Sequence, residues 1–322
     1  MSETKKHNRI LTILLVMMIF VLACSINTAP TNSNPPAVDG TKIALEFQAT
    51  QISLQQTQAA LSNAQAQPPP VQATEPPAVQ APAATEAPAA EAPDYEALIK
   101  NAKILVYENT DERNIGLFVK EALDNLGLKY THTGSYSGHF MQNLNSGTIY
   151  DLVIVDAEDK DIISGEFWDV INTRLNRDKA ALIVEVWYLN TEANGPINKI
   201  MSKCGIAYRK DIDFDDSIYW WDPTNPIFNQ PNTVLPLLNF SRFWNGGNGE
   251  AGDQIRLTGN GDATMLAGLT ASSGQEGVMA VCMQGRVIFQ TFSDHDYHEG
   301  DIVPLWENYI YNTLKAHFEA IQ

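Results

Sequence analysis

The sequence predicts an α/β fold in which helices cover both faces of a doubly wound, mostly parallel sheet, built by residues 94–322. In this region short, nearly continuous apolar segments alternate with amphipathic helical segments, as expected of buried parallel strands. All six tryptophans lie there, whereas 11 of the 17 prolines fall between residues 24 and 93. One globular domain therefore follows a long extended region.

The first half of the domain repeats a strand and a helix several times. Asn109-Thr110-Asp111 is a helix cap candidate, and the helix after it has an apolar face and ends at Gly127. The sequence predicts strands at 103–107, 129–133, 151–156 and 180–187, and helices at about 115–126, 139–144, 162–175 and 196–203.

The second half is less regular. Residues 206–269 hold four of the domain's six prolines and a glycine-rich stretch, and we interpret them as a long irregular excursion rather than a second core. The segments 278–283 and 286–292, joined by a tight turn at Gln284-Gly285, predict antiparallel neighbours. A helix at 303–321 is expected to dock on the sheet.

The N-terminus has the features of an export signal. Lys5, Lys6 and Arg9 precede an apolar run, residues 10–23, that is shorter than the roughly 20 residues of a membrane-spanning helix. Val21-Leu22-Ala23-Cys24 resembles the lipobox of bacterial lipoproteins. The resemblance implies removal of residues 1–23, acylation of Cys24 with chains such as palmitate, and anchoring to the cell membrane at its extracytoplasmic face. An uncleaved signal anchor with an incidental cysteine is the alternative.

Three segments separate this signal from the domain. Residues 24–40 are polar and predict a disordered tether. In residues 41–65, Phe47, Leu54 and Leu61 recur every seven residues, which predicts a helical stalk that is either a weak homo-oligomeric coiled coil or a solitary helix. Residues 66–93 are rich in proline and alanine and predict a stiff linker, in which residues 68–93 would reach roughly 80 Å at about 3.1 Å per residue.

Charge excludes one class of partner. The formal net charge is −17, and the domain holds 17 basic against 32 acidic residues. A nucleic-acid-binding surface requires clustered basic residues, so we expect no nucleic-acid partner.

The C-terminal part resembles a known superfamily. Gly285-Arg286-Val287-Ile288-Phe289, then Ser293-Asp294-His295, then a closing helix from Pro304 are similar to the class I glutamine amidotransferase-like superfamily, nearest to its trehalose-utilisation type. The resemblance implies a flavodoxin-like sheet. After strand 180–187, however, Tyr188, Leu189 and Asn190 stand where an amidotransferase has its nucleophilic cysteine.

Besides Cys24, the chain holds only Cys204 and Cys282. Neither has the glycine-flanked surroundings of a nucleophile. We expect buried structural thiols, with a disulfide between them as the alternative in an oxidising compartment.

The densest chemical cluster follows the last predicted strand. Asp294, His295, Asp296 and His298 are expected at the carboxyl edge of the sheet, where doubly wound folds bind ligands. Imidazoles with carboxylates suit either a divalent cation or an acid-base pair of His295 with a neighbouring aspartate. A solvated polar loop is the alternative.

Aromatic and acidic residues provide weaker candidates. Tyr188, Trp220 and Trp221 are candidate contacts for a sugar ring, although tryptophans in such a pair more often pack into a core. Asp211, Asp213, Asp215 and Asp216 partly resemble a calcium loop but lack its glycine and distal glutamate, so a solvated loop is favoured. No phosphate-binding glycine motif is present.

These observations favour a lipid-anchored extracytoplasmic binding or scaffold module, with a carbohydrate or cell-wall component as the candidate ligand. The alternative is a surface hydrolase acting on carbohydrate or peptide through Asp294, His295, Asp296 and His298, with or without a metal. A structural oligomer formed by residues 41–65 is a third hypothesis.

Overall fold

The computed structural model describes residues 93–110, 116–159, 165–212, 217–238 and 252–322. The expected signal, tether, stalk and nearly all of the linker lie outside these residues. In the described part of the chain, no helix is both long enough and apolar enough to cross a membrane.

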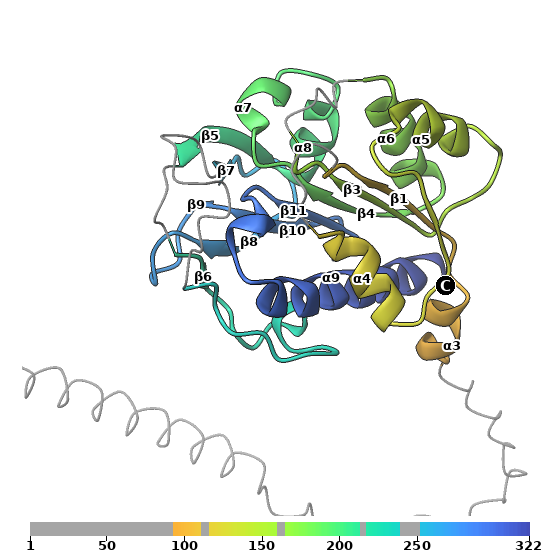
Figure 1. Cartoon of the computed structure of the whole chain (residues 1–322). Helices are drawn as coiled ribbons and strands as arrows, with labels where there is room; N and C mark the ends of the chain where they lie inside the picture. The colour runs from red at the N-terminus through yellow and green to blue at the C-terminus, as the bar shows by residue number, and fades with distance from the viewer. Residues whose placement is uncertain (1–92, 111–115, 160–164, 213–216, 239–251) are drawn as a thin grey trace, which may run out of the picture. The chain divides into compact units, whose positions relative to one another are not determined.

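A central eight-stranded sheet organises the domain (Figure 1). Its order is β2-β1-β3-β4-β11-β10-β8-β6; the first five strands are parallel, and the other three are antiparallel to their neighbours. The strands are β1 (Ile104–Glu108), β2 (Tyr130–His132), β3 (Leu152–Asp156), β4 (Ala181–Glu185), β6 (Tyr219–Trp220), β8 (Thr264–Gly268), β10 (Met279–Cys282) and β11 (Val287–Gln290).

This topology confirms the predicted α/β class with a mostly parallel sheet. Numbered among themselves, the parallel strands lie in the order 2-1-3-4-5, which is compatible with a flavodoxin-like fold. The predicted antiparallel hairpin is also present as β10 and β11. Its turn is tight because Gln284 and Gly285 both adopt positive φ, 60° and 87°.

Helices cover both faces of the sheet, and strand residues alternate between them. Ile104 and Val106 face a core that contains residues of α4 and α9, whereas Leu105 and Tyr107 face α5 and α6. The helices are α3 (Tyr95–Lys100), α4 (Phe118–Asn125), α5 (Ser137–Leu144), α6 (Phe167–Arg177), α7 (Leu189–Glu192), α8 (Asn198–Cys204) and α9 (Glu299–Ile321), with short 3-10 turns η1 (Pro226–Phe228) and η2 (Asp294–Asp296).

The region expected to be an irregular excursion is more ordered than predicted. It supplies β6 and β8 to the main sheet, and β5 (Ile206–Ile212) and β7 (Gly252–Leu257) pair with β9 (Glu276–Gly277) in a separate three-stranded antiparallel sheet. Ile206 and Ile255 pack into the same core cluster as the α5 and α6 face of the main sheet, so the described residues of this region form no separate core. These pairings join segments far apart in sequence, and no local periodicity marks them.

Cys204 and Cys282 form a disulfide, with Cα atoms 5.3 Å apart. The expectation of two separate buried thiols is therefore wrong. The two cysteines are 78 positions apart in sequence, and no local pattern indicated that the end of α8 lies beside the end of β10.

Candidate functional site

Four neighbouring parallel strands each have a polar residue at their last position. Glu108, Asp156, Glu185 and Gln290 are the last residues of β1, β3, β4 and β11, and the strand register places them side by side in one row. All four are at most 1% exposed. Residues paired in register point to the same face of a sheet, so this row lies above the α4 and α9 layer at the carboxyl edge.

Glu108 is fixed by the start of α4. Its Oε1 accepts a hydrogen bond from the backbone N–H of Val119 (2.9 Å), and its Oε2 accepts one from Lys120 (3.2 Å). Its Oε2 also lies 2.8 Å from Nε2 of His132, the last residue of β2. Backbone N–H groups in the first turn of a helix stabilise a carboxylate, so Glu108 holds His132 in place.

Asp156 and Glu185 form the centre of the row. Burial raises the pKa of Asp156 well above its usual range, and the charges of Asp294, Glu108 and Glu158 add to the increase. The pKa of Glu185 is raised well above its usual value by burial and by Glu158 and Asp156. A hydrogen bond between the two side chains adds to the increase at Glu185. Both carboxyls therefore favour the protonated form.

His295 lies in the middle of the buried acidic groups. Its Nδ1 is 2.8 Å from Oδ1 of Asp294 and 3.1 Å from Oε1 of Glu158, and its Nε2 is 3.0 Å from the carbonyl oxygen of Gly116. The ring stacks on Phe118, with centroids 4.2 Å apart. Burial lowers the pKa of His295, but Glu158 and Asp294 outweigh it and raise the pKa to about 12. Both ring nitrogens face acceptor oxygens, and the raised pKa favours the imidazolium, which can donate from both.

The two carboxylates beside His295 have further donors. Glu158 accepts from the backbone N–H of Asp294 (2.7 Å) and from the Ser293 hydroxyl (3.0 Å), and Trp306 Nε1 donates to Asp294 (2.6 Å). Burial raises the pKa of Glu158 to about 7, with His295 opposing the increase. Burial acts to raise the pKa of Asp294 too, but the charge and hydrogen bond of His295 lower it overall.

One trio has the geometry of a metal site. A carboxylate oxygen of Glu158, one of Asp294 and a ring nitrogen of His295 lie within 4.8 Å of one another. Oxygen and imidazole ligands in this number suit a divalent cation. A cation there would have to displace the proton on Nδ1 of His295. The three side chains thus form a buried cluster of one imidazole and two carboxylates, and they are also chemically able to bind a metal.

The structure places the expected cluster differently from the sequence prediction. Asp294, His295 and Asp296 are at most 1% exposed, so a solvated loop is wrong for them. His298 is exposed and lies outside the buried group. Glu158, which sequence reasoning missed, lies beside His295 together with Asp294. Its only signal was its location just after a buried strand.

The expected aromatic platform does not form. Trp220 is 5% exposed, stacks on Phe228 at 4.4 Å and donates to the carbonyl of Val234, so it belongs to the core. Trp221 is half-buried against Gly268 and donates to the carbonyl of Thr270. The interpretation of this pair as packing is confirmed.

Two other expectations concern the end of β4 and the acidic run. Tyr188 is 2% exposed and its hydroxyl donates to the carbonyl of Asp159 at 3.0 Å, so it offers no exposed contact. Asp211 accepts from Tyr208 and Asn190. The rest of that acidic run, residues 213–216, lies outside the described residues.

A surface hollow at the end of β2 was not anticipated from the sequence. It has a volume of ≈ 570 Å³ and shares the carboxyl edge with the buried row. Tyr136 is 66% exposed, and its ring lies 5.5 Å from that of His139. The lining residues are Thr131, His132, Thr133, Gly134, Tyr136, His139, Gln142 and Asn143.

No known protein family matches the sequence, and no curated protein matches it.

Proposed function

We propose that the protein is a lipid-anchored extracytoplasmic binding module that holds a carbohydrate or cell-wall ligand at the carboxyl edge of its sheet. The signal segment and Cys24 motivate the anchor, and residues 24–93 motivate a spacer between membrane and domain. The fold we assign is amidotransferase-like and flavodoxin-like, and Tyr188 stands where the nucleophile would be. A site of this kind binds its ligand without acyl transfer.

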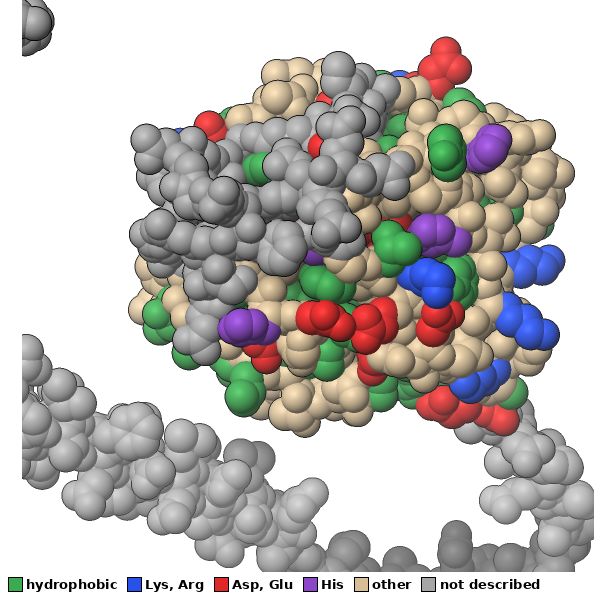
Figure 2. Space-filling view, viewed as in Figure 1, with side chains coloured by type: hydrophobic (Ala, Val, Ile, Leu, Met, Phe, Trp, Pro, Cys, Tyr) green, Lys and Arg blue, Asp and Glu red, His purple; other side chains and the backbone are tan. Residues whose placement is uncertain are grey.

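The observation that carries the proposal is the hollow beside β2. Its exposed Tyr136 ring offers an apolar face for a sugar, and its threonine, amide and imidazole groups offer hydrogen bonds to hydroxyls. Acidic side chains gather on the surface over α4 and α9 (Figure 2). A neutral, hydroxyl-rich ligand suits this acidic domain better than a polyanion does.

Calorimetric titration of the full chain with oligomers of N-acetylglucosamine and of glucose tests this proposal. We expect saturable binding by one of the two, reduced about fivefold or more by Tyr136→Ala, since an aromatic contact in a site contributes ~1 kcal/mol or more. Leu235→Ala is the control, because Leu235 is 72% exposed and lies outside the hollow. Absence of binding, or equal binding by Tyr136→Ala, contradicts the proposal.

A metal-assisted surface hydrolase is the second candidate, and the trio of Glu158, Asp294 and His295 favours it. Metal content of the purified full chain, measured by mass spectrometry before and after chelation, tests it together with hydrolysis of nitrophenyl glycosides and peptides. This candidate requires a stoichiometric metal and an activity that chelation removes. If His295→Gln retains full activity, the trio is not its site.

Oligomerisation through residues 41–65 is a separate proposal, motivated by the heptad pattern alone. Sedimentation of the full chain and of a chain lacking residues 41–65 tests it. A stalk that assembles gives different oligomeric states for the two proteins, whereas equal states contradict it.

A further inference from the structure

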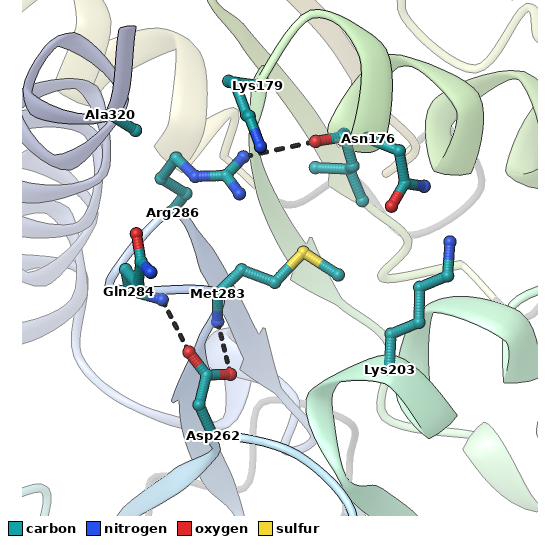
Figure 3. Close-up of a pocket in the computed structure, with 9 residues that line it drawn as sticks. Asn176, Lys179, Lys203, Asp262, Met283, Gln284, Arg286 and Ala320 are labelled. Carbon is teal, nitrogen blue, oxygen red and sulfur yellow. Dashed lines mark hydrogen bonds between the residues drawn. The ribbon is translucent and has the colours of Figure 1, made fainter. Parts of the chain in front are cut away.

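A second cavity lies at the opposite, amino edge of the sheet (Figure 3). Its volume is ≈ 330 Å³. Lys179 precedes β4, Arg286 precedes β11 and Asp262 precedes β8, while Met283 and Gln284 follow β10. The end of α8 contributes Lys203. This cavity therefore lies at the end of the parallel strands opposite to the carboxyl-edge site.

Three of the cavity's side chains are cationic, in a domain that has an excess of acidic residues. No described carboxylate lies within ion-pair distance of Lys179, Lys203 or Arg286; Lys203 donates only to the amide oxygen of Asn172, at 2.8 Å. Figure 3 shows Lys203, Met283 and Arg286 arranged around the opening. These cations therefore form no direct ion pair with a side chain of the described residues.

Arg286 is the buried member, with 7% of its surface exposed. Its Nη1 donates to the carbonyl oxygens of Ala180 (3.0 Å) and Leu175 (3.4 Å), and its Nε donates to no described residue. Burial lowers the pKa of Arg286, while Asp262 opposes the decrease. Burying a guanidinium that has carbonyl partners but no ion pair costs desolvation free energy, and an anion bound beside it would offset that cost.

Among the described residues that line the cavity, Asp262 is the only acidic one, and its carboxylate already has hydrogen-bond donors. Its two oxygens accept hydrogen bonds from the backbone N–H groups of Met283 and Gln284, each at 2.8 Å. Asp262 therefore holds the turn after β10 in shape and does not pair with the cationic side chains.

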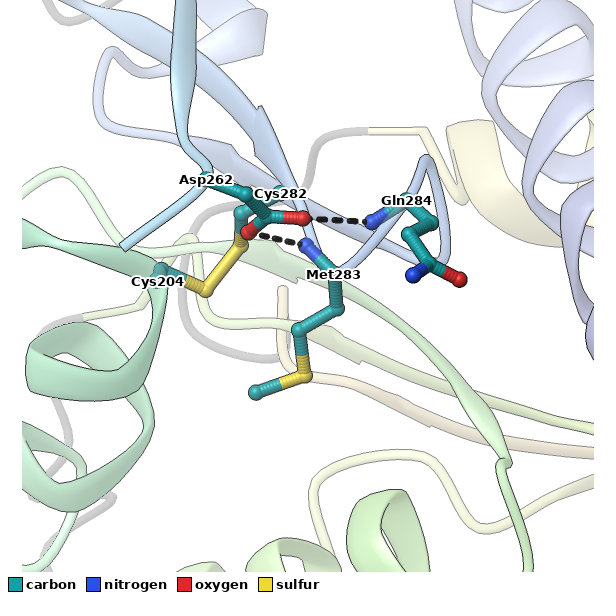
Figure 4. Close-up of a disulfide and its surroundings, with 5 residues drawn as sticks. All are labelled: Cys204, Asp262, Cys282, Met283 and Gln284. Atoms are coloured by element: carbon teal, nitrogen blue, oxygen red, sulfur yellow. Dashed lines mark hydrogen bonds between the residues drawn. A yellow bond between two sulfur atoms is a disulfide. The ribbon is translucent and has the colours of Figure 1, made fainter.

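The walls of the cavity are joined covalently. A disulfide joins Cys204, which directly follows Lys203 in the sequence, to Cys282, which directly precedes Met283. Figure 4 shows the disulfide beside Met283. Among the described residues, the three non-glycine residues with positive φ are Lys179 (56°), Met283 (51°) and Gln284 (60°), and all three line this cavity. At Met283 and Gln284 this conformation belongs to the tight β10–β11 hairpin, which places both residues at the cavity.

We propose that this cavity binds a doubly charged tetrahedral oxyanion, a phosphate or sulfate group, between the amines of Lys179 and Lys203 and the guanidinium of Arg286. Three cations suit a dianion, and its oxygens accept charge-assisted hydrogen bonds from amine and guanidinium donors. The site does not depend on the proposed carbohydrate function at the other edge.

Calorimetric titration of the full chain with inorganic phosphate at constant ionic strength tests the proposal, with sulfate and acetate as comparison anions. Calorimetry is preferable to a melting experiment, because phosphate and sulfate stabilise proteins nonspecifically. We expect one saturable site for phosphate and sulfate, with acetate at least tenfold weaker. The absence of saturable binding, or equal binding of acetate, overturns the proposal.

The matched variants are Lys179→Gln with Lys203→Gln, against Lys129→Gln as control, since all three lysines are exposed. We expect the double variant to bind phosphate at least tenfold more weakly, because the loss of one charged hydrogen bond alone weakens binding by a factor of about ten. Lys129→Gln should bind like the unmodified chain. Equal affinity in the double variant overturns the assignment of the site.

A third arm separates the sources of the group. Glycerol 3-phosphate represents a soluble phosphate ester, and vesicles with and without phosphatidic acid represent a lipid headgroup. If the full chain binds glycerol 3-phosphate or the phosphatidic acid vesicles, and the double variant does not, the result supports the site and identifies the source of the group. If the double variant still binds both probes, the result contradicts the site.

Discussion

His295 and Glu158 are 137 positions apart in sequence, yet Nδ1 of one lies 3.1 Å from Oε1 of the other, with both side chains at most 1% exposed. The carboxyl ends of β3 and β11 bring them to the same edge of the sheet, on either side of β4. His295 is the cation that compensates an otherwise acidic and buried group of side chains.

Removing this cation should destabilise the fold. We expect His295→Gln to lower the free energy of unfolding by about 3–5 kcal/mol, because Glu158 and Asp294 lose their buried partner. Denaturant unfolding followed by circular dichroism measures the change. His298→Gln is the control, with an expected change within about 0.5 kcal/mol for an exposed residue. Equal stabilities of the two variants would contradict the role given to His295.

Stability should fall as the pH rises above about 5. The pKa of Glu158 is raised to about 7, so its contribution is complete below its unfolded value of 4.5 and is lost between 4.5 and 7. The pKa of His295 is raised to about 12, so its contribution is complete below 6.5 and is lost from there upward. Asp156 and Glu185, whose pKa values are also raised, act in the same direction.

Denaturant midpoints at pH 5, 7 and 9 measure this dependence. We expect Glu158→Gln to remove much of the decrease between pH 5 and 7, because that carboxyl no longer titrates. The opposite trend, with stability increasing from pH 5 to 9, would show that these groups are not buried as described.

The disulfide should be a major source of stability. Closing a loop with 78 residues of separation restricts the unfolded chain, and a native disulfide typically contributes about 2–4 kcal/mol. For a domain of this size, its reduction should lower the melting temperature by about 5–15 °C. Calorimetry with and without a reductant tests this. In the variant Cys204→Ala with Cys282→Ala the reductant should have no effect.

The packing of Trp221 should depend on the absence of a side chain at Gly268. A Cβ at Gly268 would lie 2.1 Å from Cζ2 of Trp221, so Gly268→Ala should destabilise by about 1–3 kcal/mol. Gly138→Ala is the control, because nothing lies within 4 Å of its Cβ position. Adding Trp221→Leu should recover part of the loss in thermal unfolding; no recovery would mean that the clash lies elsewhere.

The buried row shows why the site was only partly predictable. The sequence placed the strands containing Asp156 and Glu185 correctly, and it identified Asp294 and His295 as the densest chemical group. It gave no reason to join them with Glu158, and it could only ask whether Glu108 converges on the same site, since the answer requires the order β1-β3-β4-β11 and the register across it. Local sequence patterns predict which residues are buried and which segments form strands, but they do not predict which strands are neighbours.

The aromatic and cysteine residues illustrate the same limit. Trp220 and Trp221 are adjacent in sequence, and their location in core and half-buried packing was set by β6 and β8 joining the main sheet. The pairing of Cys204 with Cys282 likewise depended on the end of α8 meeting the end of β10.

The sequence by itself determined the fold class, because strand and helix periodicities are local and repeat along residues 94–322. It also determined the excess of acidic residues and the lack of a nucleophilic cysteine after β4. Only the tertiary structure decided which acids surround His295, which cations face one cavity, and that the cysteines are bonded. Those relationships depend on strand order and register, which bring distant residues within a few ångströms and remove them from water.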